Sequence, residues 1–140
     1  MEHLKLVVRY AETDKMGIVH HANYFIWFEA ARSFIIKKIG LSYADIENKY
    51  GLYLPIISCD CSIRKPNYYD KEVIVKCIIK ELIGTRIKFY YEVINEENQL
   101  TAYGNTEHVF VNKEFKPINI KKKLPDIYNK LLELKLSVLF

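Results

Sequence analysis

A carboxylate precedes the most apolar segment of the chain, where a polar turn leads toward a predicted helix. Asp14 is followed by Gly17 and then by the adjacent pair His20 and His21. A carboxylate can attack an activated carbonyl directly or act as a general base that delivers water to it. Unpaired amides and the dipole at a helix N-terminus favour negative charge developing on the carbonyl oxygen. Residues 10–32 therefore bring together groups that acyl transfer requires.

Both polar features also have simpler interpretations. Aspartate before a glycine turn often caps that turn, so Asp14 could be purely structural. The adjacent histidines suggest a metal site, but neighbouring side chains point in different directions, and only His3 and His108 could add imidazoles. Because a catalytic zinc needs three convergent protein ligands, we predict no metal and no cofactor.

The segment after this turn predicts a long helix over residues 23–39, ended by Gly40. Its apolar side chains cover nearly the whole circumference, which is typical of a helix enclosed by other elements. The helix is too short and too charged to cross a membrane. Glu29 and Arg32 lie three positions apart on it, a spacing that favours an ion pair ordering the helix.

Strand-like segments surround the helix. We expect strands over residues 3–11, 54–65, 71–82, 86–94 and 100–111, a short helix between an N-cap at Ser42 and Gly51, and a C-terminal helix over 126–136. A run of strands after a helix argues for an α+β fold with an antiparallel sheet. We predict one domain, residues 1–140, in which five strands curl around one long buried helix.

Composition narrows the function classes. The formal net charge is only +4, with acidic and basic residues interleaved, so a nucleic-acid-binding face is not indicated. Cys59, Cys61 and Cys77 leave one thiol over in any disulfide scheme, and we interpret all three as small core residues. No secretion signal is recognisable at the N-terminus, which favours a cytoplasmic location.

The fixed spacing of the first segment supports a family assignment. The pattern is Tyr10-x-x-Thr13-Asp14-x-x-Gly17-x-Val19-x-His21-x-Asn23-Tyr24, continued by Phe28-Glu29-x-x-Arg32. It resembles the signature of the hotdog-fold acyl-CoA thioesterases, in particular the 4-hydroxybenzoyl-CoA thioesterase and YbgC-like branch. Further matches are Pro66, Asp70, Gly84, Gly104, Pro117 and Pro125. Tyr69 departs from the pattern, because many relatives have glycine there.

The resemblance implies roles for particular residues. Asp14 would be the nucleophile or general base, the backbone amide of His21 would polarise the thioester carbonyl, and Gly17 would let the loop approach closely. Tyr24 would line the substrate pocket. Arg86 and Lys88, which flank the central hairpin, would hold the phosphates of coenzyme A, with residues 121–123 as a second choice. Glu29, Asp60 and Asp70 are interpreted as structural.

The resemblance also implies an assembly and a reaction. The family forms dimers with the active site at the interface, so we expect a homodimer or homotetramer. The predicted function is hydrolysis of small or medium acyl-CoA thioesters, aliphatic or aromatic, with coenzyme A as part of the substrate. The alternatives are a thioesterase acting on acyl carrier protein and a non-catalytic acyl-CoA binding or assembly protein. Membrane insertion is not expected.

Overall fold

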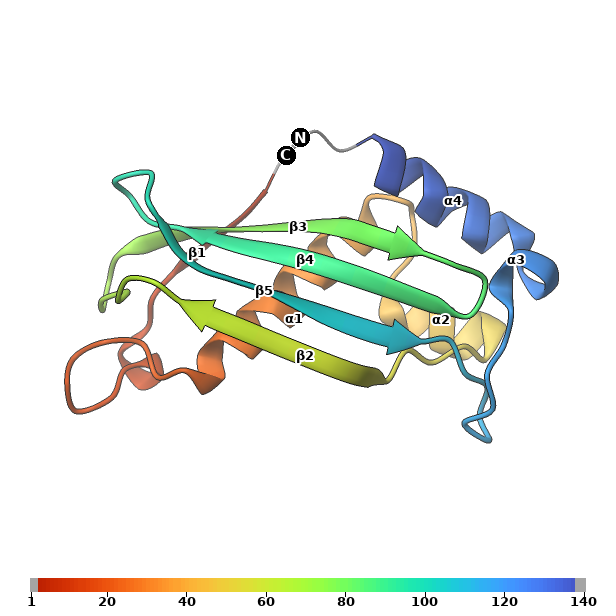
Figure 1. Cartoon of the computed structure of the whole chain (residues 1–140), viewed down its shortest axis with the longest axis horizontal. Coiled ribbons are helices and arrows are strands. Elements are labelled where there is room, and N and C mark those ends of the chain that lie inside the picture. Colours follow the sequence, from red (N-terminus) through yellow and green to blue (C-terminus); the bar gives the residue numbers. More distant parts are fainter. Residues whose placement is uncertain (1–2, 138–140) are drawn as a thin grey trace.

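The computed structural model describes residues 3–137 and contains one antiparallel sheet with helices packed against it (Figure 1). In chain order the elements are β1 (Leu4–Val7), the 3-10 turn η1 (Tyr10–Glu12), α1 (Ala22–Lys37), α2 (Tyr43–Tyr50), β2 (Ile56–Ile63), β3 (Glu72–Leu82), β4 (Arg86–Ile94), β5 (Leu100–Val109), α3 (Ile120–Lys123) and α4 (Pro125–Leu136). The five strands lie in the order β1-β3-β4-β5-β2. The α+β hotdog architecture predicted from the sequence is confirmed.

The centre of the sheet is a meander of three strands. Buried and half-buried side chains alternate along β3, β4 and β5, so that one face of each strand packs toward the core. The turn at Gly84 joins the first two strands, and the polar loop from Asn95 to Gln99 joins the next two. The bounds of β4 are those predicted.

The first strand is shorter than expected. β1 ends at Val7, although the sequence predicts a strand to residue 11. The chain instead turns at Tyr10–Glu12, because the side chain of Glu12 accepts a hydrogen bond from the backbone amide of Arg9 and closes a tight turn. The turn starts the loop that carries Asp14.

Helix α1 runs along one face of the sheet (Figure 1). Its buried side chains recur at helical spacing and form the centre of the core: Tyr24, Trp27, Phe28, Ala31, Arg32, Ile35 and Ile36. The expectation that the helix is buried all round is wrong for the single chain. Phe25 and Ile26 are 36% and 55% exposed, because no element of the same chain covers that side.

Strand β2 forms one edge of the sheet and is largely open to solvent. Seven of its eight residues are exposed, including Ile56, Ile57 and Ile63 at nearly half of their surface. Cys59 on this strand is exposed and Cys61 is half-buried, so only Cys77 is the core thiol that the sequence predicts. The open edge explains the difference, since side chains there have no covering layer.

The remaining helices close the far side of the core. Ser42 and Asp45 form the predicted capping box at the start of α2, and Gly51 ends that helix in the left-handed conformation. Helix α4 packs near β3 and buries Ile127, Leu131 and Leu134. The four-residue helix α3 is an element that the sequence does not predict.

Candidate active site

Asp14 lies at the tip of a short loop that the backbone closes on itself. Thr13 and Val19 form an isolated antiparallel bridge across the base of the loop, and the amide of Asp14 donates to the carbonyl of Ile18. The Oδ1 atom of Asp14 accepts from the amide of Met16 at 2.8 Å. The side chain is half-buried. Within residues 3–137, Oδ2 has no hydrogen-bond partner, so one carboxylate oxygen is available for chemistry.

Gly17 lies in the Asp14 loop, and His21 directly precedes α1. Gly17 is exposed and has φ +79°, a left-handed conformation that glycine adopts without strain and that turns the chain back toward the helix. His20 Nδ1 accepts from the amide of Ala22, which occupies the first helical donor. The amide of His21 has no acceptor among the described residues, so it remains free at the start of α1.

Glu12 is a site residue that the sequence does not reveal. It lies two positions before Asp14, is only 4% exposed and accepts from Trp27 Nε1 through Oε2 at 2.7 Å. Burial alone would raise the pKa of Glu12, but hydrogen bonds from Arg9 and Trp27 outweigh it and lower the pKa below its usual value. The indole partner is 15 residues away, a separation without a local sequence signal.

Tyr24, which the resemblance places in the substrate pocket, is buried in the single chain. It is 1% exposed, and its hydroxyl accepts from Asn67 Nδ2 at 3.0 Å. The carbonyl of Asn67 in turn accepts from the amide of Val19 at the base of the Asp14 loop. The tyrosine therefore supports the segment behind the loop and offers no surface to a ligand in the single chain, because its place on the helix faces the core.

Arg86 and Lys88 lie together but far from Asp14. Both line a small cavity of about 150 Å³ with Glu81, Ile83, Ile87 and Glu107, and Arg86 forms an ion pair with Glu107 at 3.3 Å. They belong to the start of β4, whereas the Asp14 loop contacts Tyr68 beside the start of β3, at the opposite end of the sheet (Figure 1). Strand β4, which runs from one of these ends of the sheet to the other, has nine residues and is therefore roughly 30 Å long.

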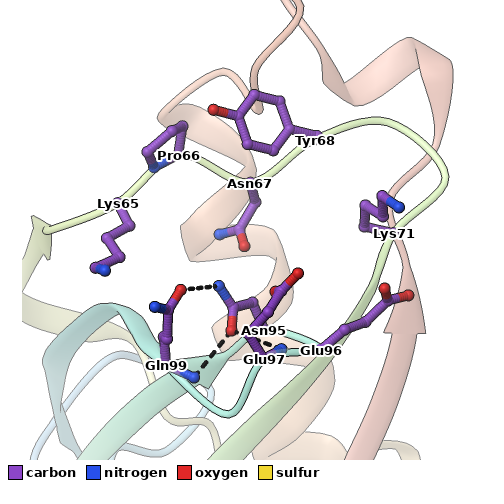
Figure 2. A pocket seen from close by; sticks show the side chains of 9 residues that line it. All are labelled: Lys65, Pro66, Asn67, Tyr68, Lys71, Asn95, Glu96, Glu97 and Gln99. Carbon is purple, nitrogen blue, oxygen red and sulfur yellow. Dashed lines mark hydrogen bonds between the residues drawn. The ribbon is translucent and has the colours of Figure 1, made fainter.

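A cleft of about 350 Å³ is lined in part by Tyr68, which pairs with Ile18 of the Asp14 loop. Figure 2 shows residues 65–71 on one side and the β4–β5 hairpin on the other. Asn95 Nδ2 donates a hydrogen bond to Gln99 Oε1 within the hairpin. Lys65, Lys71 and Glu97 are the charged residues among those that line the cleft, together with Glu96. Asp14, Gly17, His21, Tyr24, Arg86 and Lys88 do not line this cleft.

Arg32 does not pair with Glu29 as predicted. It is 7% exposed and donates to the hydroxyls of Tyr43 at 2.9 Å and Tyr91 at 3.0 Å, while Glu29 lies exposed on the helix surface. Burial disfavours the charged guanidinium, but the two tyrosines outweigh it and hold the pKa of Arg32 above its usual value. The reason for the difference is direction: the Arg32 side chain points into the core.

The other acidic residues have structural environments. Asp60 Oδ1 accepts from the backbone amide of Asn105 at 3.2 Å, across the β2–β5 pair. Asp70 has φ +64° and donates its amide to the carbonyl of Val8, so the turn around the unusual Tyr69 places its left-handed residue at the aspartate. Tyr69 itself packs edge-on against Tyr10 at 5.7 Å.

Two other features are absent from the part of the chain that the structure describes. No group of three histidine, cysteine, aspartate or glutamate side chains is arranged to hold a metal ion there. None of the described helices has the length and apolar character needed to cross a membrane.

The five-stranded antiparallel sheet packed against one long helix is the hotdog fold of the thioesterases. A search against protein families matches residues 16–102 to the Thioesterase superfamily. The chain belongs to this family, and is a thioester hydrolase by class.

Individual relatives agree. Over 123 residues the chain is 39% identical to the Bacillus subtilis protein named "Putative acyl-CoA thioesterase YneP", covering 87% of this chain and 88% of that protein. A Prochlorococcus marinus 1,4-dihydroxy-2-naphthoyl-CoA hydrolase is 26% identical over 118 residues, 79% of this chain and 78% of the relative. The crystal structure of a DHNA-CoA thioesterase from Staphylococcus aureus superimposes with a TM-score of 0.88 at 36% identity, covering 95% of this chain and 89% of that one.

Proposed function

We propose that this protein hydrolyses small or medium acyl-CoA thioesters to a free acid and coenzyme A. The observation that carries the proposal is the half-buried Asp14 carboxylate, with one oxygen free, on the loop that leads into the unpaired His21 amide. The relatives named above, an acyl-CoA thioesterase and two enzymes for a hydroxynaphthoyl-CoA, support the substrate class. The acyl group itself stays open between aliphatic and aromatic.

Two chemical routes suit Asp14. As a general base it would take a proton from water, whose oxygen attacks the carbonyl carbon; the carbon–sulfur bond then breaks and the proton reaches the departing thiolate. As a nucleophile it would attack the carbonyl carbon, the carbon–sulfur bond would break and coenzyme A would leave as the thiolate; water would then cleave the mixed anhydride, releasing the free acid and restoring the Asp14 carboxylate. In either route the His21 amide would donate to the carbonyl oxygen as negative charge develops there.

The substrate would lie between two copies of the chain. Arg86 and Lys88 are too far from Asp14 of the same chain to hold the phosphates of its substrate. A second copy paired antiparallel along β2 would bring its own β4 start to the Asp14 end and would cover Phe25, Ile26 and the exposed isoleucines of β2. We therefore propose a homodimer or a higher oligomer built from it, in which each site takes residues from both copies.

The decisive experiment measures free-thiol release from aromatic, short, medium and long acyl-CoAs with the wild type, Asp14→Asn and Asp126→Asn. The first variant keeps the shape of the side chain, and the second makes the same change at an exposed aspartate of α4. We expect turnover of one substrate class, reduced about 10³-fold or more by Asp14→Asn alone. Hydrolysis at the wild-type rate in Asp14→Asn would make Asp14 structural.

The phosphate contacts and the assembly need separate tests. Arg86→Ala with Lys88→Ala is expected to raise KM more than it lowers kcat, because these residues would bind a remote part of the substrate. An unchanged KM would remove them from the site. Multi-angle light scattering at micromolar concentration is expected to give at least a dimer, and a monomer under those conditions would contradict the shared site.

A thioester on acyl carrier protein is a second candidate substrate, favoured by the distribution of charge. Residues 112–137 carry seven of the 21 lysines and arginines but only three of the 17 acidic residues, so the whole formal excess lies in this segment. Six of these lysines are exposed, at and around α3 and α4. Faster turnover of carrier-protein than of coenzyme A thioesters, lost when Lys121, Lys122 and Lys123 become serine, would select this candidate.

The non-catalytic alternative and the predicted location each have a separate test. Binding of acyl-CoA without turnover of either thioester would instead support a non-catalytic binding or assembly protein. The predicted cytoplasmic location is tested by fractionation of cells that express the protein.

A further inference from the structure

Glu12 is an unusual residue to find beside the proposed active site. Among residues 3–137 it is the one buried carboxylate, only two positions before Asp14. An ionised carboxylate loses its hydration on burial and is tolerated only where hydrogen bonds replace the water. Its partners therefore indicate its task.

The side chain of Glu12 joins the start of the Asp14 loop to the central helix. Oε1 accepts from the amide of Arg9 at 2.8 Å, and Oε2 accepts from Trp27 Nε1 at 2.7 Å. Trp27 is itself 2% exposed and packs edge-on against Tyr24 at 5.2 Å, so the anchor on α1 is rigid. Both oxygens point into the protein, which leaves neither for a substrate.

The backbone of Glu12 holds the other end of the same loop. Its carbonyl accepts from the amide of His20 at 2.8 Å and from Asn23 Nδ2 at 2.9 Å. One residue therefore fixes the chain two positions before Asp14 and one position before His21. The separation between the Asp14 carboxylate and the free His21 amide depends on this junction.

We propose that Glu12 is the positioning residue of the site, which sets the geometry between the Asp14 carboxylate and the His21 amide through its bonds to Arg9, Trp27 and His20. The inference rests on the function proposed above and goes beyond it, because Glu12 touches no substrate. Misplacement of a reacting group by about 1 Å can cost roughly a hundredfold in rate, so the hydrogen bonds of Glu12 are expected to influence kcat more than KM.

Glu12→Gln tests the inference at the atomic level. Glutamine has one acceptor oxygen and one NH2 group, so either Arg9 N–H or Trp27 Nε1–H must face a donor. We expect kcat to fall about tenfold to a hundredfold while KM changes less than about threefold. Glu47→Gln, the same change at an exposed position of α2, is the control and is expected to keep the wild-type kcat.

A double variant separates positioning from general damage. Trp27→Phe removes the indole N–H donor. In the double variant with Glu12→Gln, the NH2 group of the glutamine can therefore face the phenylalanine ring while the glutamine oxygen accepts from the amide of Arg9. Glu12→Gln combined with Trp27→Phe should therefore be no slower than Glu12→Gln alone. Rate losses that multiply in the double variant, or an unchanged kcat in a folded Glu12→Gln protein, would overturn the inference.

Amide hydrogen exchange provides a readout that needs no substrate. In Glu12→Gln, residues 13–21 are expected to exchange faster than in the wild type, with α4 unchanged. Unchanged exchange in this loop would refute the positioning role even if the variant is slow. If the wild type hydrolyses no thioester, the proposed function fails, and the exchange result still decides whether Glu12 fixes the loop.

Discussion

Within residues 3–137 the protein buries two charged side chains in the region of its central helix, and it stabilises them in different ways. Glu12 at the Asp14 loop accepts one hydrogen bond on each oxygen, from Arg9 and Trp27. Arg32 in the middle of the core donates to two tyrosine hydroxyls and lies 5.9 Å from the ring centre of Phe89. The first arrangement holds a loop, and the second joins the layers of the fold. Damage to the two should therefore be visible in different measurements.

Arg32, Tyr91, Thr106 and His108 form a chain of hydrogen bonds, the Arg32 network. The donor and acceptor in each bond follow from the contact of His108 at its end. His108 Nδ1 faces the carbonyl of Leu54, which can only accept, so this nitrogen carries the proton of the neutral ring. His108 Nε2 must then accept from Thr106, and Thr106 must accept from Tyr91. Hydrogen bonds thus run one way from Arg32 to the segment before β2. The Glu12 cluster, by contrast, converges on one carboxylate and one carbonyl.

The largest effect on stability is expected from removal of the Phe28 ring, which packs beside the Arg32 network, the core network of the fold. Phe28 is fully buried and stacks on Tyr91 at 4.3 Å, so Phe28→Ala leaves a cavity beside the Arg32 contacts. The free energy of unfolding is expected to fall by about 3–5 kcal/mol. Phe115→Ala, at a side chain that is 71% exposed, should change it little. Urea denaturation of both variants checks the difference.

The next effect is a pH dependence that only one of the two clusters produces above pH 5. Burial lowers the pKa of His108 to about 4; the hydrogen bond to Leu54 opposes the shift and the charge of Arg32 adds to it. The unfolded chain, with a histidine pKa near 6.5, then binds more protons between about pH 6.5 and 4. Stability is full above this window and falls by about 3 kcal/mol toward its lower end.

Glu12 also loses stability as the pH falls, but over a lower pH range than His108. Its pKa is lowered by folding, so its contribution is present above the usual glutamate value of 4.5 and is lost only as the pH falls through the folded value. Of the two clusters, only the one that contains His108 should respond between pH 6.5 and 5. Denaturation at pH 7.5 and pH 5 tests this: His108→Gln should remove most of the difference, and a difference of wild-type size in that variant would contradict the assignment.

A smaller effect is expected where one hydroxyl is removed from the core network. In Tyr91→Phe, Arg32 loses one of its two hydroxyl partners while the ring keeps its stack on Phe28. The free energy of unfolding should fall by about 1–3 kcal/mol, the usual result of leaving a buried donor unpaired. Turnover per folded molecule should stay unchanged, because the network does not reach the Asp14 loop. A selective loss of kcat would show that the two clusters are coupled.

The smallest effect concerns the exposed member of the Glu12 cluster. Arg9 Nε lies 3.5 Å from Glu12 Oε1, but the arginine side chain is 72% exposed. Arg9→Ala keeps the backbone amide that donates a hydrogen bond to Glu12. The free energy of unfolding should therefore change by less than about 1 kcal/mol, and kcat by less than about twofold. A loss comparable to that of Glu12→Gln would mean that the ion pair, and not the hydrogen bonds, holds the loop.

Patterns that depend on near neighbours in the sequence predict the fold well. The capping box of Ser42 and Asp45 and the alternation of β4 between Gly84 and Asn95 are local signals, and the structure matches them. The position of Asp14 on a glycine turn before a helix is also predictable, because loop and helix are contiguous. The four-residue helix α3 is too short for periodicity to reveal.

The errors concern side chains whose partners are distant in sequence. Helical spacing pairs Arg32 with Glu29, yet its partner Tyr91 lies 59 residues away. The sequence does not reveal Glu12, because its indole partner is placed only by the packing of α1. Helical spacing alone also does not show that Tyr24 is buried against Asn67, 43 residues away. The catalytic role of Asp14 and the phosphate contacts of Arg86 and Lys88 stay predictions.

The strand order also has a consequence for the way the chain folds. The two edges of the sheet, β1 and β2, are the first two strands along the chain, whereas the three central strands follow one another later. The central hairpins close short loops, but Leu4 must find Val75 and Asp60 must find Asn105. During synthesis β1 and α1 leave the ribosome before β3, the strand that both of them contact. We therefore expect the central strands β3, β4 and β5 to pair first. Helix α1 would then pack against them, and the edge strands β1 and β2 would join last.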